Sequence, residues 1–142
     1  MSIASLIADR EQTIITCHPD QTVSDAAQLL AEKRIGALPV VEDGQVVGIF
    51  SERDLLYCIA KVGAEALAKP IRAVMTSPAI TISPEEKAFD TLALMTRRRI
   101  RHLPVVDGGR LVAFVSIGDI VKYRIDKVEA EASQLRDYIQ LA

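Results

Sequence analysis

At residues 35–54 the chain reads IGALPVVEDGQVVGIFSERD, and at residues 100–119 it reads IRHLPVVDGGRLVAFVSIGD. The second stretch is a copy of the first, displaced by 65 residues. Extended outward without a gap, residues 13–60 match residues 78–125 at 15 of 48 positions, whereas unrelated chains of ordinary composition would share about three. Such an internal repeat predicts two structural units of the same kind.

The composition is that of a folded globular chain. Its 142 residues are 49% hydrophobic and 25% charged, enough for one domain with a proper core. Each repeat alone would be marginal at about 60 residues, so we expect the two units to share a core. The net charge of −2 provides no general basic surface for nucleic acid.

The sequence also lacks the signals of secretion or membrane insertion. Its apolar runs are shorter than the ~20 residues that a membrane span requires, and no basic region precedes a sustained apolar one near Met1. Two cysteines, Cys17 and Cys58, are too few for a disulfide framework. We therefore expect a cytoplasmic protein with no membrane partner.

Residue patterns predict a β-α-β-β-α order in each unit, hence a mixed α/β (α+β) fold. In the first unit, Thr22 and Asp25 mark a helix start, and Gly36 is the expected helix end. An Asp-Gly turn joins two apolar strands. The predicted strands are 13–16, 38–41, 45–50, 79–83, 103–106 and 110–115; the predicted helices begin at Thr22, Ser51, Pro84 and Ser116.

Segments outside the repeat set the expected boundaries. We assign 1–62 to the first unit with an N-terminal helical lead-in, 63–77 to a linker, 78–125 to the second unit and 126–142 to a helical extension. Apolar residues in and before this extension follow a heptad-like 4, 3, 4, 3, 4 spacing: Val121, Ile125, Val128, Ala132, Leu135 and Ile139. This seam is expected either to pack back on its own subunit or to form a dimer contact.

A short polar motif follows the hairpin of each copy. It reads Ser-Glu-Arg-Asp at 51–54 and Ser-Ile-Gly-Asp at 116–119. Taken alone, S-x-x-D at the head of a helix is most simply a capping box, in which hydroxyl and carboxylate satisfy free backbone N–H groups. The same groups can also bind a ligand, because a carboxylate accepts hydrogen bonds from sugar hydroxyls.

With both motifs in register, the chain resembles tandem cystathionine β-synthase (CBS) domains. The resemblance rests on LPVV followed by an acidic residue and glycine, and then on G-I-F-S-E-R-D. It covers the chain from about Ile3 to Ile125. It implies two units packed as one module, a common disc-shaped homodimer, and adenosyl ligands such as AMP, ADP, ATP, NAD or S-adenosylmethionine. Such modules usually sense ligands and perform no chemistry of their own.

The resemblance also assigns roles to individual residues. It implies that Asp54 and Asp119 bind ribose, that Ser51 and Ser116 bind ribose or phosphate, and that Arg53 meets a phosphate. Thr76 offers a hydroxyl where the first copy has Glu11. The expected walls of the adenine pocket are Ile14, Ile15, Ile80 and Pro104.

The two copies differ at positions that matter for this chemistry. Ala113 replaces Gly48 and Gly118 replaces Arg53, so the second copy is not expected to grip phosphates in the same way. The basic run 97–102 has three interpretations: a solvated helix end, a nucleic-acid contact, or phosphate binding by Arg101 and His102. Nucleic acid is the weaker one, given the acidic balance and few aromatic residues.

The leading functional hypothesis is an adenine-nucleotide sensor that signals to an unidentified effector protein. Nucleic-acid binding and a purely structural dimeriser are the alternatives. An enzyme is poorly supported, because no nucleophile–base pair, metal set or glycine-rich phosphate loop is visible. Cys17 and His18 alone are a weak signal for a metal or thiol centre, so none is predicted.

Overall fold

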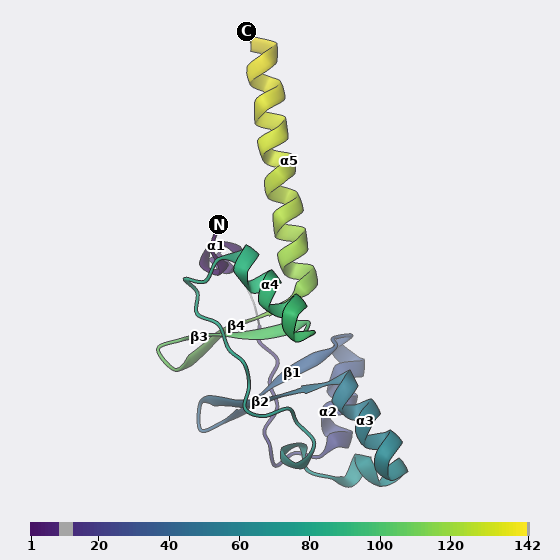
Figure 1. The fold of residues 1–142 in the computed structure, drawn as a ribbon. Helices are drawn as coiled ribbons and strands as arrows, with labels where there is room; N and C mark the ends of the chain where they lie inside the picture. The colour runs from purple at the N-terminus through teal and green to yellow at the C-terminus, as the bar shows by residue number, and fades with distance from the viewer. Residues whose placement is uncertain (9–12, 142) are drawn as a thin grey trace.

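Two antiparallel β hairpins, one from each copy of the repeat, lie face to face at the centre of the fold (Figure 1). The computed structural model describes residues 1–8 and 13–141. The first half contains α2 (Val23–Lys33), β1 (Ala37–Glu42), β2 (Gln45–Ser51) and α3 (Glu52–Val62). The second half contains α4 (Ala88–Arg98), β3 (His102–Asp107), β4 (Arg110–Ser116) and α5 (Ile117–Leu141). The remaining elements are α1 (Ile3–Ala8) and the 3₁₀ turns Gly63–Ala68 and Ile71–Ala73.

The hairpins repeat each other in detail. Leu38 pairs with Phe50 in one hairpin, and Leu103 pairs with Val115 in the other. Each register shifts once, between Val40 and Val41 in the first hairpin and at the equivalent place, between Val105 and Val106, in the second. The predicted Asp-Gly turn is present, because both Asp43 and Gly44 have positive φ (51° and 78°), as a tight two-residue hairpin turn requires.

The predicted leading strands 13–16 and 79–83 do not form as expected. Residues 13–16 contain no strand, and the single parallel bridge of the first half lies at the next residue, Cys17 with Val40. The strand predicted at 79–83 shrinks to the parallel bridge of Ile82 with Val105. A proline stands two residues after each bridge, at Pro19 and at position 84, and a residue without an N–H cannot extend a ladder. The order of elements is as predicted, but each sheet has two strands.

Helix boundaries follow the local signals in the first half but not fully in the second. Thr22 caps α2 through a reciprocal capping box with Asp25, as predicted, although the left-handed end residue is Arg34 (φ 54°) and not Gly36. The helix predicted from Pro84 begins instead at Ala88.

Contacts with α1 explain that later start. The carbonyls of Pro84 and Glu86 accept the backbone N–H groups of Ala4 and Ile3, both at 2.8 Å. These carbonyls therefore point toward the first turn of α1, and residues 84–87 form a turn.

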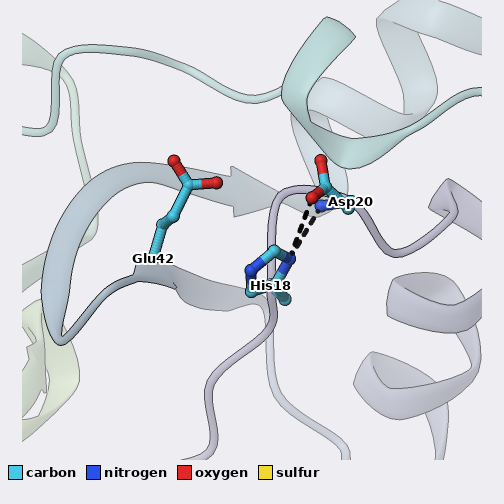
Figure 2. A group of neighbouring side chains, drawn as sticks. All are labelled: His18, Asp20 and Glu42. Atoms are coloured by element: carbon cyan, nitrogen blue, oxygen red, sulfur yellow. Dashed lines mark hydrogen bonds and ion pairs between the residues drawn. The ribbon is translucent and has the colours of Figure 1, made fainter.

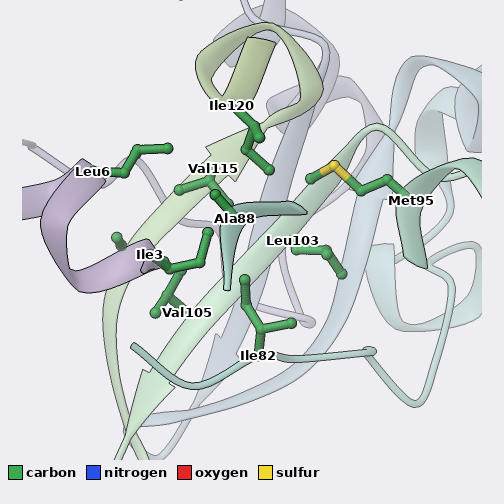
Figure 3. Packing of buried hydrophobic residues seen from close by; sticks show 10 residues of the cluster. Ile3, Leu6, Ile82, Ala88, Met95, Leu103, Val105, Val115 and Ile120 are labelled. Carbon is green, nitrogen blue, oxygen red and sulfur yellow. The ribbon is translucent and has the colours of Figure 1, made fainter. Parts of the chain in front are cut away.

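The expectation that the two units share one core is wrong, because the buried side chains form two clusters, one in each half. Ile3 and Leu6 of α1 lie in the cluster of the second half, among side chains of β3, β4 and α5 (Figure 3). Ile71, just before the second copy, is buried in the cluster of the first half. Helix α1 thus crosses to the second half, while the segment between the two copies packs on the first.

Helix α5 extends away from both halves as one continuous rod (Figure 1). Ile120 near its start is buried, but Val128, Leu135 and Ile139 are 49%, 60% and 64% exposed. Of the two expectations for the seam, packing back on its own subunit is therefore wrong. No helix in the described part of the chain is both long enough and apolar enough to span a membrane.

Candidate functional site

Two cavities open where the halves meet, and each joins a helix start of one half to segments of the other. The first, here the Asp54 cavity, has a volume of about 510 Å³, within the usual range for small-molecule sites. The head of α3 meets the segments 78–80 and 99–103. It is lined by Gly36, Ala37, Ile49, Ser51, Glu52, Arg53, Asp54, Leu56, Tyr57, Thr76, Pro78, Ala79, Ile80, Arg99, Ile100, Arg101, His102 and Leu103.

The second, here the Asp119 cavity, has a volume of about 490 Å³. It reverses the roles of the two halves, because the head of α5 meets the segments 13–15 and 34–37. Its lining is Thr13, Ile14, Ile15, Arg34, Ile35, Gly36, Ala37, His102, Phe114, Ser116 and Asp119. The 65-residue repeat thus produces two related cavities.

The carboxylate of Asp54 is held by three hydrogen bonds. Its Oδ2 atom accepts from the backbone N–H and the hydroxyl of Ser51, both at 2.9 Å, while Oδ1 accepts from the hydroxyl of Thr76 at 2.9 Å. The backbone N–H of Asp54 donates to the Ser51 hydroxyl at 3.3 Å. The motif is therefore a capping box for α3, as its sequence alone indicated.

This network leaves room for a ligand. A carboxylate has about four acceptor positions, so three bonds leave one open on Oδ1. The Thr76 hydroxyl donates to Asp54, so its own lone pairs can accept another bond. Two hydroxyl groups on adjacent carbons could then be bound by Asp54 and Thr76 together, not by the carboxylate alone as the sequence suggested.

The close approach of Thr76 depends on Gly48. The backbone of Thr76 pairs with Ile49 through two hydrogen bonds of 2.9 Å. A Cβ at Gly48 would lie 2.7 Å from the Met75 sulfur and 2.9 Å from the Thr76 carbonyl oxygen, too close for either. The missing side chain therefore lets Thr76 lie beside Asp54.

Three guanidinium groups gather around the same cavity. Arg53 comes from the first turn of α3, while Arg99 and Arg101 lie just before the start of β3. Arg99 ends α4 in the left-handed conformation (φ 55°), and its carbonyl accepts a 3.2 Å hydrogen bond from Arg53. Glu52 and Asp54 are the only acidic residues among the described residues of the lining, so its described charges sum to +1. Arginine clusters of this kind bind phosphate groups.

His102 lines both cavities. Its ring stacks on Phe114, with centroids 5.5 Å apart. Burial lowers the pKa of His102, against the opposing effect of Asp119 and Glu52, while Arg101 lowers it further. The imidazole is therefore neutral at neutral pH and acts as a hydrogen-bonding group.

In the Asp119 cavity, Ser116 and Asp119 repeat the capping arrangement. The Asp119 carboxylate accepts the Ser116 N–H at 2.8 Å, and the Asp119 N–H donates to the Ser116 hydroxyl at 3.0 Å. Among the described residues, Arg34 is the only arginine of the lining. Glu11, the counterpart of Thr76, lies outside the described residues.

These observations agree with the comparison against known families. The family model of the CBS domain matches residues 10–61 and 71–126, which contain the two copies of the repeat. The chain belongs to the CBS domain family. The CBS pair of Agrobacterium tumefaciens ATU1752 has a similar structure, with a TM-score of 0.83 and 35% identity over 87% of this chain and 99% of the other.

A curated protein also resembles this chain in sequence. The mitochondrial CBS domain-containing protein CBSX3 of Arabidopsis thaliana is 36% identical over 87% of this chain, which spans 63% of that protein. Two similar CBS structures contain ligands. CBSX2 was solved with AMP, and its TM-score is 0.78 at 25% identity, over 88% of this chain and 97% of the other. The MJ0100 pair was solved with 5′-methylthioadenosine and S-adenosyl-L-methionine. Its TM-score is 0.77 and its identity 27%, over 89% of this chain and 98% of the other.

The CBS pair brings most of the predicted site residues into two groups. The Asp54 cavity collects seven: Ser51, Arg53, Asp54, Thr76, Ile80, Arg101 and His102. The Asp119 cavity collects Ile14, Ile15, Ser116 and Asp119, and shares His102. Pro104 lines neither cavity; it is buried in β3, where its carbonyl accepts the Ile82 N–H.

Sequence reasoning missed several lining residues, although some had a signal. Tyr57 follows Arg53 by four residues and so shares its face of α3. Arg34 and Arg99 are equivalent in the repeat, and both end a helix in the left-handed conformation. Phe114 had no signal, because its role depends on the position of His102.

The Cys17–His18 pair does not form a reactive centre. Burial raises the pKa of the Cys17 thiol to about 11. His18 lies near Asp20 and Glu42, with candidate ligand atoms within 4.8 Å of one another (Figure 2). However, the Arg72 guanidinium is ion-paired with both carboxylates. This group is best described as an ion network that ties the linker to the first half.

Proposed function

We propose that this CBS pair is a non-catalytic regulatory module that binds a phosphate-bearing adenosyl ligand in the Asp54 cavity. The observation that carries the proposal is the fixed Asp54 carboxylate, with one open acceptor position beside the Thr76 hydroxyl and three arginines around it. The binding of AMP, methylthioadenosine and S-adenosylmethionine by similar CBS pairs supports an adenosyl ligand.

In the proposed complex, the ribose hydroxyls bind Asp54 and Thr76. The phosphate lies toward Arg53, Arg101 and His102, and the base packs on apolar side chains such as Ile80. The positive lining favours AMP, ADP or ATP over S-adenosylmethionine, whose sulfonium carries positive charge. NAD also carries phosphates and belongs in the same screen.

Ligand binding between the halves supplies a route to regulation. The Asp54 cavity is lined by residues of both halves, so a bound nucleotide contacts both and favours the arrangement that fits it best. A partner protein that recognises this arrangement would receive the signal. Amide hydrogen exchange with and without nucleotide measures the change: protection should increase at 51–57 and at 99–103 together. Protection confined to one half would contradict this mechanism.

Calorimetric titration with AMP, ADP, ATP, NAD and S-adenosylmethionine tests the ligand and the site. We expect Asp54→Ala to weaken nucleotide binding at least tenfold, because a hydrogen bond to a charged group contributes about 1.5–3 kcal/mol. The matched variant Asp119→Ala removes the equivalent carboxylate and should change affinity by less than about threefold. Thermal melts establish that both variants fold.

The outcomes separate the two parts of the proposal. Absence of binding by all five compounds would refute the adenosyl ligand. Binding that is lost in Asp119→Ala but retained in Asp54→Ala would place the ligand in the other cavity. One CBS relative is mitochondrial, so the cytoplasmic location expected from the sequence stays a prediction.

A further inference from the structure

The exposed part of α5 carries a continuous apolar stripe. The stripe, here the seam, consists of Val121, Ile125, Val128, Ala132, Leu135 and Ile139. Its five large members are between 42% and 64% exposed. Soluble chains rarely leave so regular an apolar surface uncovered, and its 4, 3 spacing is that of the a and d positions of a coiled coil.

The contacts that dock α5 on its own chain lie near its start and leave the seam exposed. Ile120 is 1% exposed in the core of the second half, and Ile117 and Tyr123 pack against the same core. Successive helical residues are rotated by about 100°, so Ile120 lies about 100° and Tyr123 about 160° from the centre of the seam, while Ile117 stands in the first turn, before the seam begins. The helix is therefore anchored at its base, and the seam beyond it stays exposed and available for another molecule.

The charged residues beside the seam indicate what that molecule is. In the heptad, Arg124 and Glu131 occupy g positions, while Lys122, Glu129 and Arg136 occupy e positions. None of these five takes part in an ion pair within the described part of the chain. Flanking charges at e and g select the partner and its orientation in coiled coils.

A second α5, parallel and in register, matches these charges. Each g residue then faces the e residue five positions later on the other helix. Arg124 faces Glu129, and Glu131 faces Arg136, so both pairs are attractive and each occurs twice by symmetry.

The antiparallel arrangement is less favourable. With full overlap of the seams, Glu129 would face Glu129, Glu131 would face Glu131, and Lys122 would face Arg136. All of these pairs repel. A shift of one heptad removes the repulsion but leaves Leu135 and Ile139 beyond the partner's seam.

We propose that two copies of this chain associate through α5 as a parallel, in-register, two-stranded coiled coil. The a positions hold Ile125, Ala132 and Ile139, and the d positions hold Val121, Val128 and Leu135. The branched residue at a with Leu at d that is typical of parallel dimers occurs at Ile139 and Leu135, and the charge pairs set the orientation. The two-fold axis then runs along α5, so the two CBS bodies lie at the same end of the coil. The seam residues are not among those that line the two cavities.

Sedimentation analysis of the full chain tests the seam. We expect the double variant Ile125→Asp/Leu135→Asp to sediment with half the mass of the wild-type assembly. The matched double variant Ser133→Asp/Gln134→Asp adds the same charges outside the seam and should keep the wild-type mass. A seam variant that keeps the wild-type mass, or a wild-type monomer or trimer, would overturn the proposal. Thermal melts and nucleotide binding show that each variant is folded.

Charge reversal tests the orientation. Glu129→Lys should weaken the dimer roughly tenfold at low salt, because two attractive pairs become repulsive. Adding Arg124→Glu should restore most of the affinity in a parallel coil, since the reversed pair attracts again. In either antiparallel register, the second substitution brings no such rescue. Failure of the double variant to recover would therefore refute the parallel arrangement.

Discussion

At the scale of single residues, His102 connects the chemistry of both cavities with the stability of the fold. Its ring stacks on Phe114 at the wall that the two cavities share. Burial is the largest influence on it and lowers its pKa below the ordinary value of 6.5. The folded chain therefore holds a neutral imidazole at a pH where the unfolded chain already binds a proton.

This difference predicts a pH dependence of stability. Below about pH 6.5 the unfolded state binds more protons than the folded state at His102, so the free energy of unfolding falls as the pH falls. His102→Gln removes this contribution and should flatten the decline between pH 7.5 and 5.5. Urea unfolding at several pH values measures it. Equal slopes for wild type and variant would contradict the prediction.

Single residues also show how far the sequence could predict the site. Ser51 and Asp54 could be predicted together because the S-x-x-D motif fixes their separation along the chain. Thr76 was named separately, and its hydrogen bond to Asp54 depends on the fold. Pro104 could not be judged in this way. Its neighbour His102 faces a cavity while Pro104 is buried, and this depends on how the halves pack.

At the scale of elements, the two capping boxes of the first half allow a matched comparison. Thr22 caps α2 and Ser51 caps α3 with the same geometry, but only Ser51 binds a carboxylate that lines the Asp54 cavity. We expect Thr22→Ala and Ser51→Ala each to reduce the free energy of unfolding by about 1 kcal/mol. Only Ser51→Ala should also weaken nucleotide binding.

Denaturant unfolding and calorimetry of the two capping variants measure these effects side by side. If Thr22→Ala weakened binding as much as Ser51→Ala, the loss would come from general destabilisation and not from the site.

Elements that depend on local signals were predictable, and those that depend on distant contacts were not. The cap at Thr22 and the turn at Gly44 are local and are confirmed. The start of α4 at Ala88 was missed because α1 binds the carbonyls of residues 84 and 86. No pattern near residue 84 could indicate a helix made 80 residues earlier.

At the scale of the whole molecule, the two separate cores predict separable effects of core substitutions. Ile3 is fully buried in the cluster of the second half, and Leu38 in that of the first. Each change to Ala should cost about 2–5 kcal/mol. Hydrogen exchange should rise first in β3 and β4 for Ile3→Ala, and first in β1 and β2 for Leu38→Ala.

The same pattern of exchange in both variants would contradict this prediction and would indicate that the halves unfold as one unit. Sequence patterns could not reveal this division. They show which residues are apolar, but they do not show that α1 crosses to the second half.

The docking of α1 also has a consequence for the chain as it leaves the ribosome. Ile3 and Leu6 are made before the other residues of their core, the first of which, Ile82, follows about 80 residues later. At roughly 5–20 residues per second, the interval is about 4–16 seconds. During that time the first half has its own core-forming strands, while the apolar face of α1 has none. The nascent chain therefore emerges with an early segment that cannot reach its native partner until translation is well advanced.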